Sequence, residues 1–161
     1  METIQKAYDA IGGLTPLKGA DCGELCGKIC CRGDTAGMLL FPGEKKIFRK
    51  LREFTIEKID YMDTSKANLL MCDDVCSREL RPLACRIFPV APFVDKLGNV
   101  GARPDIRGRN MCPIWDLSRV DKDFIKAVAK AFKILSADKK ALSFMRLISA
   151  EVDELERFYK K

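Results

Sequence analysis

The sequence predicts an α+β fold, in which a small, loop-rich cysteine module with short strands precedes a C-terminal antiparallel helical hairpin. Three observations lead to this prediction. Four of the eight cysteines fall within the ten residues from Cys22 to Cys31, in the run CGELCGKICC. Short apolar stretches typical of strands follow this run. The last part of the chain, from about residue 118, has no cysteine and has a helical apolar period.

The length of 161 residues suits a single domain spanning residues 1–161. We divide it into a cysteine-rich metal-chelating module over residues 22–113 and a helical hairpin over residues 118–161 that packs on the module. Hydrophobic residues make up 47% of the chain, which is enough for a modest core.

The first elements are predicted from short apolar patterns. A helical pattern within residues 1–11 predicts one short helix that ends at Gly12 and Gly13. Residues 37–42 predict a short strand that is stopped by a proline. From Glu44 to Phe54 the apolar residues fall on one helical face, so we expect a helix there.

The central part of the module is expected to hold strands and turns. Residues 55–71 predict two strands, the second leading into Cys72. A tight turn follows, and Pro82 is expected to open a single helical turn that carries Cys85 and ends at Pro89. Residues 90–100 predict a hairpin with Gly-Asn turn chemistry. Residues 102–113 are expected to be a polar loop that delivers Cys112.

The cysteine-free end predicts two helices. Ser118 and Asp121 have the spacing of a helix start box. Apolar residues then share one face as far as residue 135, the pattern breaks at residues 136–138, and it resumes as far as residue 159.

The chemistry of the chain depends on its cysteines. There is no histidine, so a site for a soft metal must be built from thiolates. All eight cysteines are candidate metal ligands: Cys22, Cys26, Cys30, Cys31, Cys72, Cys76, Cys85 and Cys112. Eight thiols divide into two four-ligand sites or into one larger cluster with spares.

An iron–sulfur cluster is one interpretation. Cys22, Cys26 and either Cys30 or Cys31 would supply three near ligands, and Cys112 the remote one, as many clusters require. We favour a cluster over zinc narrowly, because of this spacing.

Zinc is the alternative. Cys72 and Cys76 would form one ligand pair, and a second pair would come from elsewhere in the chain.

Composition limits the compartment and the partners. No apolar run is long enough to span a membrane, and the N-terminal residues lack the pattern of a signal peptide. We therefore expect a cytoplasmic protein whose thiols are ligands and not disulfides. The net charge of +6 is compatible with an acidic partner, but no basic block is interleaved with aromatics, so nucleic acid is disfavoured. Arg103, Arg107 and Arg109 are candidates for binding an anionic ligand.

The motif RPLACRIFP, at residues 81–89, together with the earlier run ending in a Cys-Cys pair, resembles the CxxCxxCC zinc- or iron-chelating domain family. The likeness covers roughly residues 22–113. That domain type also occurs in flagellin lysine N-methylase, where it is associated with an iron–sulfur cluster. The resemblance implies chelation of a metal or cluster by the eight cysteines. This chain has no recognisable S-adenosylmethionine loop, so methyltransferase activity is not implied.

Three hypotheses for function follow. The first is a cytoplasmic metal-chelating domain that holds an iron–sulfur cluster or zinc. The second is a redox or group-transfer enzyme component that uses the metal centre. The third is a zinc-stabilised module that binds protein or nucleic acid. The sequence contains no motif that identifies catalytic residues.

Overall fold

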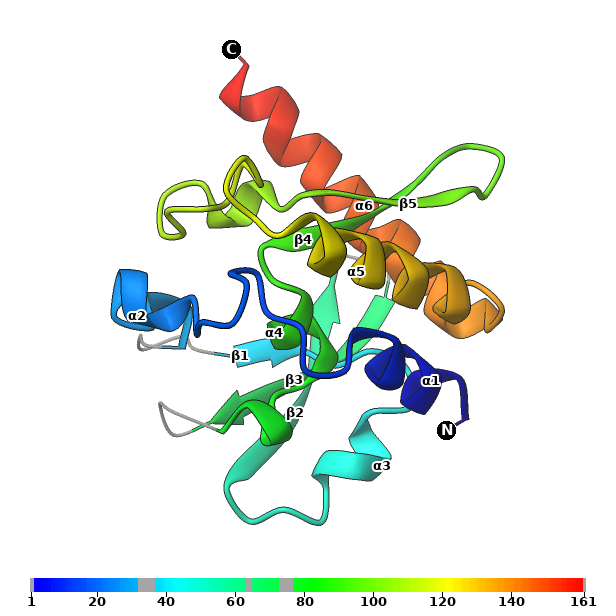
Figure 1. Ribbon diagram of the computed structural model, residues 1–161. Coiled ribbons are helices and arrows are strands. Elements are labelled where there is room, and N and C mark those ends of the chain that lie inside the picture. Colours follow the sequence, from blue (N-terminus) through cyan, green and yellow to red (C-terminus); the bar gives the residue numbers. More distant parts are fainter. Residues whose placement is uncertain (1, 32–36, 63–64, 73–76, 161) are drawn as a thin grey trace.

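The computed structural model describes residues 2–31, 37–62, 65–72 and 77–160. It confirms the predicted α+β class, because helices and antiparallel strands both occur and two long helices end the chain (Figure 1). The predicted turn between Cys72 and Cys76 lies outside the described residues, as does Cys76 itself.

The N-terminal helix α1 (Glu2–Ile11) is present as predicted. Its apolar face is buried, with Ala7 fully covered and Ile11 1% exposed. Gly12 follows with a φ of 54°, a left-handed conformation that ends a helix at little cost only in glycine. The buried face packs against α5 (Lys122–Leu135), so the two ends of the chain share one core.

Three strands form an antiparallel sheet in the order β1 (Gly37–Leu39), β3 (Ser65–Cys72), β2 (Phe54–Tyr61). The two strands predicted within residues 55–71 are thereby confirmed. The register pairs Gly37 with Met71. The strand that follows the cysteine run therefore begins beside the end of the strand that carries Cys72.

The helix predicted from Glu44 to Phe54 is wrong in extent, because α3 (Lys45–Phe48) is a single turn and Phe54 begins β2. The apolar face does pack together, since Phe48 and Phe54 meet edge to face with ring centroids 5.4 Å apart. These rings belong to a small core beside the sheet, formed with Leu40 and Leu70. The apolar residues that have a helical spacing in this stretch therefore lie in three different structures: a turn of helix, a loop and a strand.

The motif at residues 81–89 folds as predicted. Helix α4 (Leu83–Ile87) follows Pro82 and ends before Pro89. A hairpin of β4 (Val90–Val94) and β5 (Val100–Pro104) comes next. The prediction of a polar loop over residues 102–113 is partly wrong, because β5 extends to Pro104 and a short helix, η3 (Ile106–Gly108), follows.

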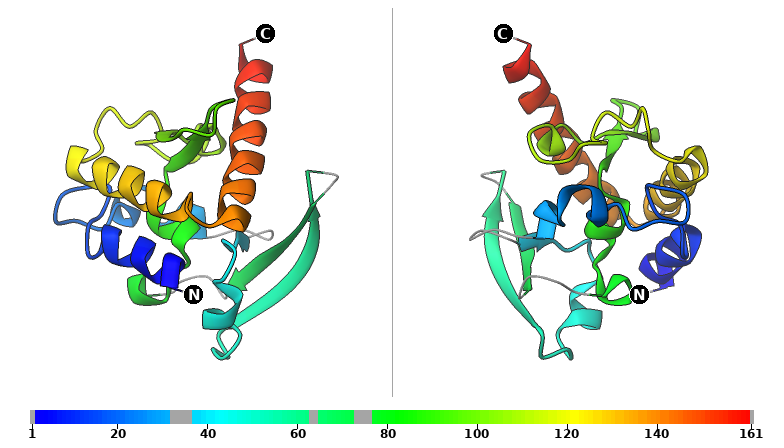
Figure 2. Two further views of the ribbon diagram at one scale, coloured as in Figure 1. Left: turned by 90° about the vertical axis from the view of Figure 1, so that its right-hand side faces the viewer. Right: turned by 60° about the vertical axis from the view of Figure 1, so that its left-hand side comes forward.

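The predicted C-terminal helical hairpin consists of α5 and α6 (Lys139–Tyr159). Asp121, not Ser118, caps α5, because its side chain accepts a hydrogen bond from the N–H of Asp123. The two helices diverge steeply from their connection, and the end of α6 projects beyond the rest of the chain (Figure 2). Helix α5 packs on α1 and β5, and α6 packs on β4. Among the described residues, no helix combines the length and the apolar character that a bilayer crossing requires.

Glu44 joins three separate segments inside the core. Its side chain is fully buried, and its carboxylate accepts hydrogen bonds from the hydroxyl of Tyr8, the N–H of Phe41 at 2.6 Å and the N–H of Leu83 at 2.7 Å. Burial raises the pKa of Glu44 to about 6, although these hydrogen bonds and the charge of Arg86 oppose the rise. This carboxylate therefore ties α1 and the start of α3 to the first residue of α4.

We predict that, as the pH falls from about 7 to about 4.5, the wild-type protein gains about 2 kcal/mol of unfolding free energy relative to a Glu44→Gln variant. The folded-state pKa of about 6 exceeds the ordinary value of 4.5. The stabilisation that Glu44 contributes is therefore complete below the ordinary pKa. It is lost as the pH rises through the folded-state pKa. Urea unfolding across this pH range measures it. The exposed Glu57→Gln should follow the wild type, and a Glu44→Gln profile parallel to wild type would contradict the prediction.

Candidate functional site

Four cysteines from two distant segments line one small cavity. They are Cys22, Cys26, Cys30 and Cys112. The rest of the lining is apolar and comes from Ile29, Phe88, Pro89, Pro113 and Ile114. The cavity has a volume of about 20 Å³. The three near cysteines and the remote Cys112, which the spacing grouped as ligands of one possible centre, thus line the same cavity.

The near cysteines are arranged by a sharp reversal of the backbone. Helix α2 (Gly23–Cys26) ends at Gly27, and the next helical turn, η1 (Ile29–Cys31), begins two residues later. Gly27 and Lys28 both lie in the left-handed region, with φ values of 59° and 60°. For lysine this conformation costs about 1 kcal/mol. The reversal brings Cys26 and Cys30 to the same cavity.

Contacts within the run hold this reversal in place. The N–H of Lys28 donates to the carbonyl oxygen of Gly23 at 2.9 Å. The N–H of Gly23 in turn donates to the Asp21 carboxylate at 3.0 Å. A Cβ at Gly23 would lie only 2.7 Å from Cγ of Lys28, so the lysine stem packs directly over the glycine backbone.

Cys112 is positioned by the turn after η3. Its N–H donates to the carbonyl oxygen of Gly108 at 2.7 Å. Gly108 is buried, and a Cβ there would lie 2.9 Å from the ring of Phe88 and 3.4 Å from Cβ of Cys112. The absence of a side chain at Gly108 therefore lets the Phe88 ring and the Cys112 turn pack closely beside the cavity.

The environment of the cavity favours protonated thiols. Burial raises the pKa of Cys22 to about 11, with further contributions from the charges of Asp21, Cys112 and Cys26. Burial also raises the pKa of Cys112. Arg81 acts in the opposite direction on Cys22, and it lies 3.6 Å from the Asp21 carboxylate. Thiols in such surroundings become thiolates when a cation offsets the cost of their charge.

Cys30 and Cys31 form a close pair, with their sulfur atoms 4.0 Å apart. The pKa of Cys31 is lowered to about 6, first by the hydrogen bond with the Cys30 thiol and then by the charges of Arg81 and Lys28. The same hydrogen bond raises the pKa of Cys30. One thiolate therefore forms readily in this pair, at the position nearer to the basic side chains.

Of the remaining predicted ligands, Cys72 and Cys85 do not line the cavity. Cys72 ends β3 and Cys85 lies within α4, while Cys76 is outside the described residues. Across the described part of the chain, no three cysteine or carboxylate side chains already stand in an arrangement that could hold a metal ion. The sulfur atoms around the cavity must therefore move closer together to coordinate one. A ligand role for all eight cysteines stays a prediction.

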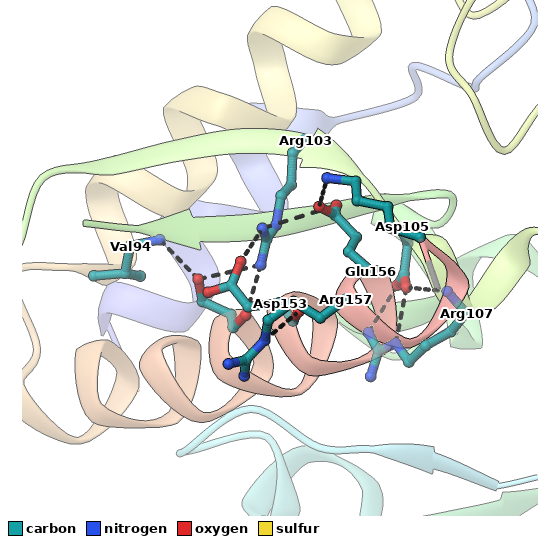
Figure 3. Close-up of polar contacts among 9 residues, drawn as sticks. Val94, Arg103, Asp105, Arg107, Asp153, Glu156 and Arg157 are labelled. Carbon is teal, nitrogen blue, oxygen red and sulfur yellow. Dashed lines mark hydrogen bonds and ion pairs between the residues drawn. The ribbon is translucent and has the colours of Figure 1, made fainter. Parts of the chain in front are cut away.

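Arg103 was predicted as a loop residue, but it lies in β5 and faces α6 (Figure 3). Its guanidinium donates to the carboxylate of Asp153 and to the carbonyl oxygen of Ser149, both at 2.6 Å. Its side chain is only 14% exposed. These contacts fasten the hairpin of β4 and β5 to the C-terminal helix.

Arg107 and Arg109 also contact groups within the chain. Arg107 makes a two-pronged pair with Asp105, at 2.8 and 2.7 Å, and a further bond to Glu151 of α6 at 2.8 Å. Arg109 lies over the ring of Tyr159, 4.7 Å from its centroid. Carboxylates of the chain thus already balance Arg107, as they do Arg103. The predicted binding of an anionic ligand by these arginines is untested.

Some residues around the cavity were not assigned to a site from the sequence. Phe88 and Pro89 were recognised only as part of the motif at residues 81–89, and neither Ile114 nor Arg78, whose charge interacts with Cys22, was singled out. Their signal is weak because an apolar residue that borders a site looks the same in sequence as one in the core.

Comparison with known proteins gives no relative: no family model, no curated protein and no solved structure matches the chain. The resemblance to the CxxCxxCC family therefore remains a prediction. The function has to be argued from the residues of the chain itself.

We predict that Gly108→Ala lowers the unfolding free energy by about 1–3 kcal/mol, because the added methyl group overpacks the contact with Phe88 and Cys112. Denaturant unfolding measures the loss. Gly101→Ala is the matched control, since a Cβ at Gly101 meets the Phe93 ring at an ordinary 3.8 Å. Equal stabilities of the two variants would contradict the proposed close packing at Gly108.

Proposed function

We propose that this chain binds a metal centre through the thiolates of Cys22, Cys26, Cys30 and Cys112, as a chelating protein of a reducing compartment such as the cytoplasm. One observation carries the proposal: two segments far apart in sequence bring these four cysteines to a single cavity. Four thiolates are a complete ligand set for zinc and for common iron–sulfur clusters. The chain has no histidine that could take the place of one of them.

The surroundings of the cavity support this proposal. Cys22, Cys26, Cys30 and Cys112 are free thiols, and the other side chains that line the cavity are apolar. Arg81 supplies positive charge beside the near cysteines, which suits a centre whose four thiolates outweigh the charge of a divalent ion. When bound, zinc would cross-link the two segments, and an iron–sulfur cluster would add electron transfer.

Some observations favour an iron–sulfur cluster at this site, and another favours a single metal ion. The spacing of three near cysteines and one remote cysteine, and the family resemblance, favour an iron–sulfur cluster. The cavity volume of about 20 Å³ favours a single ion, because it is only slightly larger than the space that one water molecule needs. A cluster would require α2 and η1 to move away from Phe88 and Ile114.

A second candidate function is a redox or group-transfer enzyme component. A larger cavity adjoins the cysteine cavity and shares Ile29, Cys30 and Phe88 with it. A molecule in that larger cavity would lie against one of the proposed ligands, which is the arrangement that such chemistry needs.

We predict that protein purified without oxygen contains zinc, or iron with matching acid-labile sulfide, and that Cys112→Ser loses the metal of this site. Elemental and sulfide analysis measures both. Cys72→Ser is the matched control and should keep the metal of this site, because Cys72 does not line the cavity. A Cys112→Ser variant that keeps the full metal content of the wild type would contradict the assignment of Cys112.

We also predict that removing the metal with a chelator opens the cysteine module to protease and leaves most of the helical content intact. The thiols of the cavity lose their common partner, whereas α5 and α6 keep their packing on α1, β4 and β5. Limited proteolysis with peptide mapping locates new cuts, which we expect near residues 22–31 and 109–113. Circular dichroism follows the helices. Unchanged protease resistance after complete metal removal would count against a folding role for the metal.

A further inference from the structure

The larger cavity beside the cysteines has the size and lining of a site for a small organic molecule. Its volume is about 300 Å³, at the lower end of the range found for ligand pockets. Strand β1, helix α4, strand β4 and helix α6 all contribute walls, mainly through aliphatic side chains and Phe41 and Phe88. This mostly apolar lining suits a compact apolar molecule.

One end of this cavity is polar. Asp105 and Arg107 line it, and Asp105 is only 3% exposed. Arg107 uses Nε and one N–H of each terminal nitrogen to bind the carboxylates of Asp105 and Glu151. A guanidinium has five N–H donors, so two remain after its bonds with the described residues. Arg107 lines the cavity, and its side chain is one-third exposed.

The charges at this end select against ions. Two carboxylates, Asp105 and Glu151, face the single guanidinium of Arg107, so the group carries a net charge of −1 with all three ionised. An anionic ligand would be repelled, although Arg107 alone would attract it. A neutral oxygen, such as a ketone or an ether, can accept the spare N–H hydrogen bonds without this penalty.

Two of the exposed residues that line the cavity are large and apolar. Ile29 and Met111 both line it, and they are 46% and 44% exposed. Large apolar side chains at the rim of a concave site are typical of surfaces that bind apolar ligands. The lining, the rim and the polar end thus all favour the same kind of ligand, which is apolar over most of its surface and uncharged.

We propose that this cavity binds an uncharged, mostly apolar organic molecule, about the size of two fused rings, whose oxygen accepts a hydrogen bond from Arg107. Because Ile29, Cys30 and Phe88 are shared by both cavities, the molecule would lie beside Cys30. That the molecule is also a neighbour of a metal centre rests on the proposed function, which makes Cys30 a metal ligand.

The test uses the neutral fluorescent naphthalene ketone Prodan, whose emission moves to shorter wavelength in apolar surroundings. Titrated with the full chain as purified, it should show saturable binding to one site. Competition by two ligands of equal shape then tests the polar end: 2-acetylnaphthalene should displace Prodan, and the anionic 2-naphthoate should be about tenfold weaker or worse. 2-Ethylnaphthalene, which lacks the ketone oxygen, should displace Prodan about fivefold more weakly than 2-acetylnaphthalene does.

Two pairs of variants locate the site. Ala84→Leu fills the cavity and should weaken Prodan binding about tenfold or more, whereas Ala150→Leu, on the exposed face of α6, should not. Met111→Ala removes part of the rim and should weaken binding about threefold, whereas Leu97→Ala, in the exposed β4–β5 turn, should not. Urea unfolding confirms that each variant is folded.

Several results would overturn the proposal. No saturable binding would do so, as would binding that Ala84→Leu and Met111→Ala leave unchanged. Equal displacement by 2-naphthoate and 2-acetylnaphthalene would refute the assigned chemistry. Metal analysis of the same wild-type samples separates the two proposals: protein that binds Prodan and contains no metal would refute the metal proposal alone, and protein that contains metal and does not bind Prodan would refute the cavity proposal alone.

Discussion

The arrangement of both cavities depends on the buried carboxylate of Glu44. A carboxylate inside a core is tolerated only when its oxygens are hydrogen-bonded, and here three donors from three segments meet it. One donor is the N–H of Leu83, the first residue of α4. Because α4 has only five residues, it has little helical stability of its own. Its position is therefore set by Glu44 and by the burial of Leu83 and Ile87.

The position of α4 affects both cavities at once. Ala84 and Ile87 line the larger cavity, Pro89 lines the cysteine cavity, and Phe88 lines both. The Phe88 ring also touches the position of Gly108, next to the turn that carries Cys112. A displacement of this short helix would thus move a wall of each cavity and the contact that places the remote cysteine. The two cavities are coupled through packing, without any need for a larger conformational change.

Much of the fold could be predicted from local patterns, because long helices and hairpins are specified by residues close in sequence. The helix predicted from Glu44 to Phe54 failed for a physical reason: Phe54 fits a helical face and also a strand that alternates sides. The role of Glu44 had no local signal at all, since Leu83 lies 39 residues away. The near cysteines and Cys112 could be grouped from spacing, whereas the left-handed Lys28 that brings them together could not.

Unfavourable features are concentrated in the cysteine run. Lys28 is held in a left-handed conformation, and Cys22 is half-buried where ionisation is disfavoured. Local strain of this kind persists where surrounding structure or a bound group offsets it. In the described structure, the bonds from Gly23 to Asp21 and from Lys28 to Gly23 provide part of that support. A cation that converts the thiols to thiolates would provide the rest, because its binding energy would stabilise this strained segment.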